Sequence, residues 1–407
     1  MLSTLLISAL TLFPAGSRDE PDVLRLQGGK TIECRVLYED STRIVYRAKG
    51  KSAEIGRSEV AAVESVENSL RTYLRKYDES DRGNPRAQAE LAQWAESNGL
   101  PGEAQCGWIR ILNLEPLNEL AWAKLGGVKQ RDVWKLKVRG RFYSIEELRK
   151  RVSDWKTALE LPTAHFLVRS DGDPARLLDA AIDVERAWLA FYDVFGTALT
   201  LYVFDETPEL NFVTDPKDYP SPPVPGMSVW FDRVANSLNC NLTENPNRTA
   251  IASEFCELMI FNAFRRTLDK RTGDIEGWVR SGIAMTFGFG FRPDPGHATF
   301  DFKVPEVGQF RLVAEDKDPL PLKRILGSGR GAYDGGPGSE RYVAAAYTLV
   351  HFLAFGDEGK HRAQFGEYMR DAYIGKSGAS RLYEKLGLDE KALESAWREY
   401  VKRTAGG

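Results

Sequence analysis

The sequence is poor in the residue types that build metal centres and disulfide frameworks. Its 407 residues include four cysteines and four histidines. These are Cys34, Cys106, Cys240 and Cys256, and His165, His297, His351 and His361. No two cysteines form a Cys-x-x-Cys pair, and no two histidines stand at the spacing of two zinc ligands on one helix. A zinc site built from paired histidines on one helix is therefore excluded.

The scarcity of cysteine also argues against a disulfide-rich secreted fold. Free cysteine is among the most often buried residue types, so Cys240 and Cys256 are expected to be two buried thiols. Cys240 and Cys256 fall in the same predicted domain, and one bridge between them in an oxidising compartment is the alternative.

The chain lacks a strong excess of charge of either sign. Its formal net charge is −3, with 28% charged and 43% hydrophobic residues. This is the composition of a soluble globular protein, and it excludes a strongly basic nucleic-acid-binding surface over the whole chain. The length predicts two or three domains.

Long hydrophobic runs are also absent, apart from a short one at the N-terminus. Leu5 to Phe13 is apolar, Pro14 ends it, and Ala15-Gly16-Ser17 resembles a cleavage site. This pattern predicts a signal peptide over residues 1–17 and export to the periplasm, the cell surface or the medium. The segment lacks the basic residues that usually precede the apolar core of a signal peptide. The alternatives are therefore a start further upstream, or a membrane anchor. No other stretch approaches the length of a membrane-spanning helix, so no integral membrane domain is expected beyond this segment.

Residues 20–66 predict a small β-domain. Apolar residues alternate with polar ones, and glycine-containing turns separate the runs at roughly ten-residue spacing. The stretch "LRLQGGKTIECRVLYED" resembles small antiparallel β-barrel modules that precede larger domains in exported bacterial proteins. A structural role is expected for it.

Residues 67–152 predict a helical segment. The stretch "LAQWAESNGLPGEAQCGWIRILNLEPLNELAWAKLG" resembles one tetratricopeptide repeat and part of a second. The positions that carry the resemblance are Trp94, Gly99, Leu100, Ala104, Leu112, Pro116, Ala121, Leu125 and Gly126. One repeat cannot bury its apolar face alone, so it is expected to pack on a neighbouring domain as a spacer.

The remaining residues, 160–407, predict a mixed sheet followed by helices. The expected order is a strand at 165–171, a helix at 174–192, a strand at 199–205, a proline-rich loop at 216–225, and a hairpin or edge strand at 227–240. A helix over 248–266 comes next, and its central sequence "ASEFCELM" places Ser253 and Glu257 four residues apart with Glu254 between them. Residues at this spacing share one helix face.

This order resembles the gluzincin branch of zinc metallopeptidases, and specifically the peptidase-MA-like domains. In that family a His-Glu-x-x-His helix supplies two zinc ligands and a general base, and these positions are Ser253, Glu254 and Glu257 here. A second stretch, "GWVRSGIAMTFG", resembles the downstream helix with the third ligand, which is Ser281 in this chain. The C-terminal helices resemble the closing helices of the family, including Leu393, Trp397 and Tyr400.

The resemblance implies a zincin-like domain whose metal ligands have been replaced. Serine is a poor zinc ligand, so Ser253 and Ser281 leave Glu257 as one strong donor where three are normal. Cys256 points about 100° away from Glu257 by helix geometry and is expected to be buried. No metal or other cofactor is therefore expected, and Glu254 is a vestigial base position with no metal-bound water to activate.

Several functional hypotheses remain open at this stage. The preferred one is an exported pseudopeptidase that acts as a scaffold or binds a peptide or protein in its cleft and at the edge strand near 227–240. Ser253, Glu254, Glu257 and Ser281 are the vestigial cleft positions. The alternative is an active metallopeptidase whose zinc is held by Glu257 and unusual ligands such as His297. A serine or cysteine hydrolase is disfavoured because Ser253 and Cys256 lie inside a helix. A glycosidase is disfavoured because Glu254 and Glu257 cannot flank a sugar from opposite sides.

The predicted fold class is thus α+β and multidomain. It combines a small antiparallel β-sheet or barrel, a short tetratricopeptide-like helical segment, and a zincin-like domain with a mixed sheet and a helical C-terminal half. No nucleic-acid partner is expected.

Overall fold

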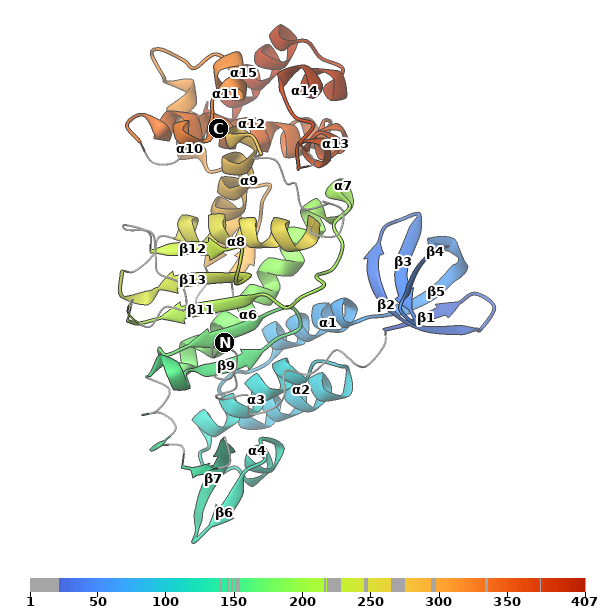
Figure 1. Cartoon of the computed structure of the whole chain (residues 1–407), viewed down its shortest axis with the longest axis vertical. Helices are drawn as coiled ribbons and strands as arrows, with labels where there is room; N and C mark the ends of the chain where they lie inside the picture. Colours follow the sequence, from blue (N-terminus) through green and yellow to red (C-terminus); the bar gives the residue numbers. More distant parts are fainter. Residues whose placement is uncertain are drawn as a thin grey trace, which may run out of the picture. The chain divides into compact units, whose positions relative to one another are not determined.

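The computed structural model describes residues 22–138, 141–144, 146–147, 150, 154–215, 217, 228–244, 248–264, 275–293, 298–333, 336–373 and 375–406. The predicted signal peptide, most of the proline-rich loop and His297 lie outside the described residues. The chain divides into two compact units, Met1–Leu189 with Val203–Pro246, and Ala190–Tyr202 with Asn247–Gly407. Figure 1 shows the strands and helices that make up each unit. Their α+β composition, with antiparallel and mixed sheets and a helical C-terminal half, confirms the general fold class.

The first unit begins with a five-stranded antiparallel sheet in the order β4-β3-β2-β1-β5. Its strands are β1 (Asp22–Leu26), β2 (Thr31–Glu39), β3 (Arg43–Ala48), β4 (Lys51–Gly56) and β5 (Val60–Glu64), with a 3-10 turn at Arg57–Glu59 before the last. Alternate side chains form one small core of Leu24, Cys34, Val36, Ile44 and Val60. The β3–β4 turn places Lys49 and Gly50 at positive φ, as a two-residue hairpin of this type requires. The predicted strands of this region are confirmed.

Four helices follow, α1 (Val66–Glu79), α2 (Pro85–Ser97), α3 (Pro101–Leu114) and α4 (Glu119–Lys124). Ser65, Asn84 and Asn118 cap the starts of α1, α2 and α4 with side-chain hydrogen bonds. Helices α2 and α3 approach closely where Gly107 faces Ala92, since a Cβ at Gly107 would lie 2.9 Å from that of Ala92.

The structure differs from the predicted helical segment over 67–152 in its last part. Residues Val128–Gln130, Val133–Val138 and Arg141–Tyr143 are strands β6, β7 and β8, which form a separate three-stranded antiparallel sheet. The reason is local, because Arg131 and Asp132 both adopt positive φ and reverse the chain. The alternation of Val133, Lys135 and Lys137 with Trp134 and Leu136 then has the two-residue period of a strand.

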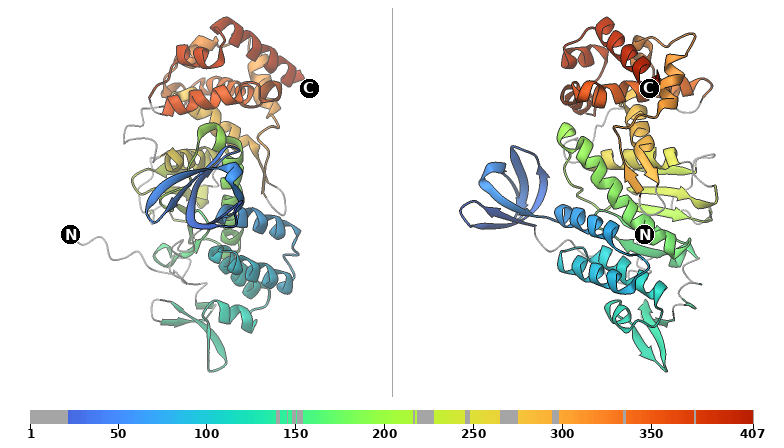
Figure 2. Two further views of the ribbon diagram at one scale, coloured as in Figure 1. Left: turned by 90° about the vertical axis from the view of Figure 1, so that its right-hand side faces the viewer. Right: turned by 180° about the vertical axis from the view of Figure 1, so that it is seen from behind.

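A mixed sheet completes the first unit, in the order β12-β13-β11-β10-β9. Its strands are β9 (Leu159–Pro162), β10 (Leu167–Ser170), β11 (Glu209–Val213), β12 (Val229–Asp232) and β13 (Ser237–Asn241), with 3-10 turns at Trp155–Thr157 and Leu242–Glu244. The pairs β10–β11 and β11–β13 are parallel, while β9–β10 and β12–β13 are antiparallel. Helix α6 (Pro174–Phe191) provides the crossover that a parallel β10–β11 pair needs. Figure 2 shows this sheet and α6 from two further sides.

The predicted strand at 199–205 is wrong. Thr200 adopts a left-handed conformation with φ of 54°, which ends α7 (Thr197–Leu199), and the chain then runs extended without pairing in the mixed sheet. Within the first unit, the Val203 N–H donates to the Leu37 carbonyl at 2.9 Å, and the Arg35 guanidinium donates to the Phe204 carbonyl. The ring of Phe204 packs against Phe166 and Trp188, which accounts for its apolar character, and β11 is the strand that enters the mixed sheet.

The second unit is mainly helical. It contains a π-turn at Tyr192–Gly196, α7, α8 (Arg248–Phe264), α9 (Gly277–Gly290), α10 (Val307–Ala314), α11 (Leu322–Gly327), α12 (Ser339–Phe355), α13 (Arg362–Tyr373), α14 (Ala379–Leu386) and α15 (Glu390–Gly406). It also has a small antiparallel pair, β14 (Phe291–Pro293) with β15 (Ala298–Phe300), and 3-10 turns at Arg330–Ala332 and Gly356–Gly359. Within the described part of the chain, no helix has the length and apolar character to span a bilayer.

Candidate functional site

Helices α8 and α9 carry the two sequence motifs and pack against each other in the second unit. The rings of Phe255 on α8 and Phe287 on α9 stack with centroids 5.8 Å apart. Trp278 on α9 is fully buried and stacks on Tyr368 of α13 at 5.8 Å. A Cβ at Gly282 would lie 2.4 Å from Val350 Cγ2, so glycine lets α9 approach α12. The tryptophan and glycine of the second motif are thus packing positions.

Arg280 brings the two glutamates of α8 together. Its Nε donates to Glu257 Oε1 at 2.8 Å, and its Nη2 lies 3.8 Å from Glu254 Oε1. The three side chains are 12–16% exposed, so this ion pair is largely shielded from water. Glu254 and Glu257 lie three residues apart on one helix face, which places both within reach of a single guanidinium from α9.

The other positions of the predicted site contribute less. Ser253 and Ser281 are half-buried on α8 and α9, and neither hydroxyl forms a hydrogen bond within the described part of the chain. Cys256 is 2% exposed, as predicted, and burial raises the pKa of its thiol well above the usual range. It is a packing residue in this environment, since the thiolate that binds metal is disfavoured there.

These residues do not fit a catalytic zinc ion. Zinc in a peptidase needs three protein donors, usually imidazole, thiolate or carboxylate. Here Glu257 is held by a guanidinium, and that fixed positive charge would repel a divalent cation placed on the same carboxylate. The two serines are weak donors. Among the described residues, no group of three or more His, Cys, Asp or Glu side chains is arranged to hold a metal.

The predicted edge strand β12 is at one end of the sheet order, and its hairpin with β13 was expected. Val229 and Trp230 are nevertheless only 3% and 6% exposed. A peptide that adds a strand needs a backbone edge accessible to solvent. These two residues do not offer one.

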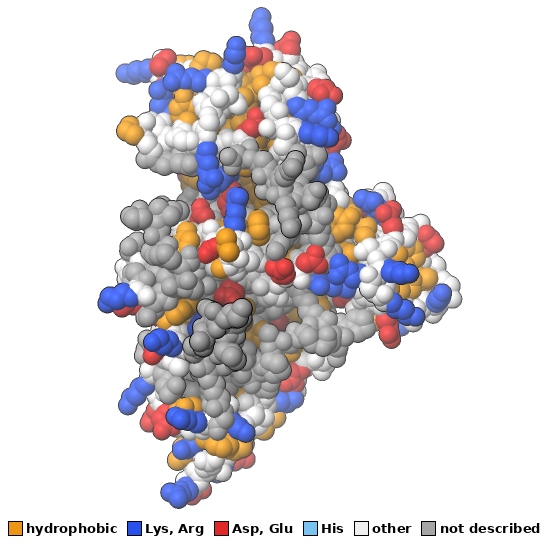
Figure 3. Space-filling view, viewed as in Figure 1, with side chains coloured by type: hydrophobic (Ala, Val, Ile, Leu, Met, Phe, Trp, Pro, Cys, Tyr) orange, Lys and Arg blue, Asp and Glu red, His pale blue; other side chains and the backbone are white. Residues whose placement is uncertain are grey.

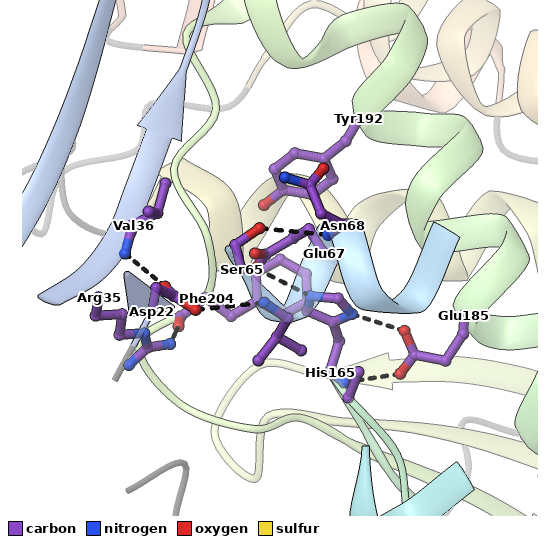
Figure 4. A network of polar contacts seen from close by, with 12 residues as sticks. Asp22, Arg35, Val36, Ser65, Glu67, Asn68, His165, Glu185, Tyr192 and Phe204 are labelled. Carbon is purple, nitrogen blue, oxygen red and sulfur yellow. Dashed lines mark hydrogen bonds and ion pairs between the residues drawn. The ribbon is translucent and has the colours of Figure 1, made fainter. Parts of the chain in front are cut away.

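A buried polar cluster in the first unit was not anticipated from the sequence. His165, in the β9–β10 connection, contacts Glu185 of α6 through its Nδ1 at 2.6 Å, and both side chains are 0% exposed (Figure 4). The indole of Trp188 stacks on the imidazole with centroids 3.6 Å apart. The Nε2 side of the ring faces Glu67 of α1 at 3.7 Å. This cluster is closed to substrate, and it connects α1 and α6 to the mixed sheet.

Glu185 is held by more than the histidine. Its Oε1 accepts hydrogen bonds from the Thr163 hydroxyl at 2.5 Å and from the backbone N–H of His165 at 2.7 Å. These bonds stabilise the charged carboxylate, because donors around a buried anion replace its lost hydration.

Glu103 of α3 also belongs to this cluster. It is 1% exposed, and its Oε1 accepts from the Ala164 N–H at 2.8 Å. Its Oε2 has no hydrogen-bond partner among the described residues. Burial, reinforced by the nearby charge of Glu185, raises the pKa of Glu103 to about 7. Glu103 is therefore a carboxyl group that the folded protein favours in its neutral form below pH 7.

The members of this cluster are far apart in the chain, so no spacing rule points to them. The usable signal was weaker: Glu103 occurs in the apolar stretch "GEAQCGWI", where a charged residue is unexpected on a buried helix face.

The remaining described histidines carry no site. His351 is buried on α12, where burial lowers its pKa to about 4, and its Nδ1 lies 2.9 Å from the Tyr400 hydroxyl. All four cysteines are free and buried, as was predicted for Cys240 and Cys256, and none forms a disulfide.

No protein-family model matches the chain, and no curated protein matches it. Function is therefore inferred from the residues and their geometry.

Proposed function

We propose that the chain is an exported binding or scaffolding protein, whose second unit contains a gluzincin-like pair of helices without metal catalysis. The observation that carries the proposal is Arg280, whose guanidinium donates a hydrogen bond to Glu257 at 2.8 Å and lies 3.8 Å from Glu254. In a zinc peptidase the positive charge at these positions comes from the metal, and the glutamate between the ligands acts on metal-bound water. Here an internal cation takes that electrostatic role, and no water is activated.

The packing of the helix pair α8 and α9 supports the same proposal. Trp278 and Gly282 secure α9 against α13 and α12, which preserves the geometry of the helices without requiring a reaction. Exchange of two ligand positions for serine and pairing of the remaining carboxylate with arginine convert a reactive centre into a structural ion pair.

A groove in the second unit offers a surface for a polypeptide partner. It has a volume of about 370 Å³ and is formed by α10, α12 and α15. Its apolar part includes Leu312, Leu320 and Ala344, and Leu312 is 56% exposed. An apolar centre with a charged rim is the usual anatomy of a protein interface.

The rim of this groove favours a partner of defined charge. Arg341 is paired with Asp316 at 2.8 Å, and Arg398 is paired with Glu394. Glu315 and Glu340 also line the groove and form no ion pair with any described residue. Their charges remain available, so we expect the occupant to be a polypeptide segment with an apolar side chain flanked by lysine or arginine.

The test of the non-catalytic assignment is metal analysis of the full-length protein, together with cleavage of a peptide library with and without EDTA. We expect substoichiometric zinc and no cleavage that EDTA abolishes. An Arg280→Met variant should not acquire activity. Stoichiometric zinc with EDTA-sensitive turnover that is lost in Glu254→Gln would establish the metallopeptidase alternative.

The test of the binding surface uses fluorescence polarisation with labelled peptides that carry one leucine between basic, neutral or acidic flanks. Basic flanks should bind best, and Glu315→Lys with Glu340→Lys should weaken that binding about tenfold, since each reversed charge contributes on the order of 0.5–1 kcal/mol at an exposed rim. Glu358→Lys with Glu399→Lys, at exposed positions away from the groove lining, is the matched control. Equal binding of all three peptide classes would remove the charge argument.

A further inference from the structure

The sheet β6–β8 is unusually basic for this protein. Residues 128–143 contain six basic residues and one acidic residue, whereas the whole chain has a net charge of −3. Five of the six basic side chains belong to described residues: Lys129, Arg131, Lys135, Lys137 and Arg141. None of the five forms an ion pair with a described residue. Lys135 helps to lower the pKa of Glu147, after the larger effect of the hydrogen bond from the Ser144 N–H.

The strand register divides the sheet into two faces. One face carries Trp134 and Leu136 of β7. Trp134 stacks on Trp122 of α4, with centroids 5.7 Å apart and planes within 7°, and Leu136 is 4% exposed. This face is packed on the helices of the same unit.

The opposite face carries apolar side chains among lysines. Val128 pairs with Lys135, Gln130 with Val133, and Lys137 with Phe142, so these six residues share a face. Val128, Val133 and Phe142 are 37%, 47% and 38% exposed. Figure 3 shows hydrophobic side chains beside lysines and arginines over the part of the chain that β6 and β7 occupy in Figure 1.

We propose that this face is a docking surface for a membrane that contains anionic lipids. The lysines and arginines would bind lipid headgroups, while Val133, Val128 and Phe142 enter the boundary between headgroups and acyl chains. Lys135 and Lys137 share this face with the three exposed apolar side chains, so the face meets both requirements of such a surface. Arg131, in the β6–β7 turn, has a long side chain that can reach the headgroups, whereas Lys129 and Arg141 lie on the face of Trp134 by register.

Two other anionic partners fit less well. Single-stranded nucleic acid is held by aromatic side chains that stack on bases, and this face exposes two valines and one phenylalanine. An acidic polypeptide would satisfy the lysines but would leave the exposed valines in contact with water unless it also supplied apolar groups. A bilayer with anionic lipids supplies both the negative headgroups and an apolar layer beneath them.

The experiment places a polarity-sensitive fluorophore on the sheet in the full-length chain. All four native cysteines are buried, so Val133→Cys provides a single reactive thiol in the folded protein. Val234→Cys, in the β12–β13 turn where the valine is 98% exposed, is the matched control. Phosphatidylcholine vesicles with phosphatidylglycerol should shift the emission at position 133 to the blue and leave position 234 unchanged. This readout is local, so insertion of the N-terminal apolar segment does not imitate it.

Charge and apolar variants then separate the two contributions. Lys135→Glu with Lys137→Glu should weaken partitioning roughly 30-fold, because each lysine near an anionic surface contributes about a fivefold factor. Lys391→Glu with Lys402→Glu, at exposed positions on α15, should have little effect. Val128→Ser with Phe142→Ser should abolish the blue shift at position 133 while leaving residual salt-sensitive binding.

Several outcomes would overturn the proposal. One is an equal response of both labels, and another is a response to phosphatidylcholine alone that salt does not reduce. A third is binding of polyglutamate or duplex DNA, at position 133, in preference to anionic vesicles. Near-ultraviolet circular dichroism of the stacked Trp122 and Trp134 verifies that each variant keeps the sheet folded.

Discussion

Replacement of Glu103 by glutamine should stabilise the protein in a strongly pH-dependent way. The buried carboxyl has a pKa of about 7 in the folded protein, against about 4.5 for a free glutamate. Below pH 4.5 the group is protonated in both the folded and the unfolded chain and imposes no pH-dependent cost. Between pH 4.5 and 7 the Glu103 carboxyl ionises in the unfolded chain but stays protonated in the folded protein. The free energy of unfolding therefore falls as the pH rises.

The size of the effect follows from the difference between the two pKa values. A difference of about 2.5 units corresponds to about 3 kcal/mol at 1.36 kcal/mol per unit. Glutamine cannot ionise, and its side-chain oxygen can still accept the hydrogen bond from the Ala164 N–H. Its NH₂ group would stand where Oε2 has no partner among the described residues, on the side of the negatively charged Glu185. We therefore expect Glu103→Gln to exceed the wild type in stability by about 1–3 kcal/mol at pH 8 and by close to zero at pH 4.5.

The assay is urea unfolding followed by tryptophan fluorescence at several pH values. Trp108 and Trp188 are both buried in the first unit and report its unfolding. Infrared spectroscopy provides a second readout, since the C=O stretch of a protonated buried carboxyl at pH 6 should disappear in the variant. Glu90→Gln, on the exposed face of α2, should give a small difference that does not change with pH.

Two results would refute this reasoning. A stability difference that is constant from pH 4.5 to 8 would mean that Glu103 titrates normally. A Glu103→Gln variant less stable at pH 8 than at pH 4.5, relative to the wild type, would mean that the ionised carboxylate is the form that stabilises the fold. Glu103→Ala should be destabilising at pH 4.5, because it leaves the Ala164 N–H without an acceptor, and this loss should shrink toward pH 8, where alanine also removes the ionisable carboxyl.

Three further variants test the other parts of the structure. Gly282→Ala should lower the free energy of unfolding by about 2–3 kcal/mol, because the new methyl group would overlap Val350; calorimetry of the second unit checks this, and an unchanged transition would show that α9 does not approach α12 closely. Arg280→Met should cost about 2 kcal/mol by removing the guanidinium that donates to Glu257, and Glu257→Gln added to it should restore about half in urea unfolding; additive losses would show that the pair is not coupled. Asn118→Ala should cost about 1 kcal/mol by removing the cap of α4, seen as faster amide hydrogen exchange in that helix; unchanged exchange would mean that the cap contributes little.

The sequence predicted those elements whose signal is local. Helix α8 and the hairpin β12–β13 followed from periodicity and from breaker residues, and α9 followed from the resemblance of its sequence to the family's downstream helix. The strand β10 was found because a single apolar run precedes a helix start at Pro174.

The missed elements depend on distant contacts or on unusual backbone angles. Residues 201–204 have strand-like composition, yet Thr200 adopts positive φ, and the Val203 N–H donates to the Leu37 carbonyl instead of pairing in the mixed sheet. The strands β6–β8 were predicted as part of a helical segment, because the stretch with their two-residue period is short and follows directly after α4. In the buried cluster, Glu103 and its hydrogen-bond donor Ala164 are separated by 61 positions, a separation at which composition carries no pairing information.

The cluster at Glu103 can form only after residues far along the chain have been synthesised. Glu103 emerges from the ribosome before Ala164, which donates its hydrogen bond, and before Glu185, which raises its pKa. Synthesis of the roughly 80 intervening residues takes on the order of 4–16 s at about 5–20 residues per second. During that interval α3 lacks the β9–β10 connection, whose Ala164 N–H is the hydrogen-bond donor to Glu103. The buried environment of Glu103 is therefore complete only after the chain has been made through Glu185.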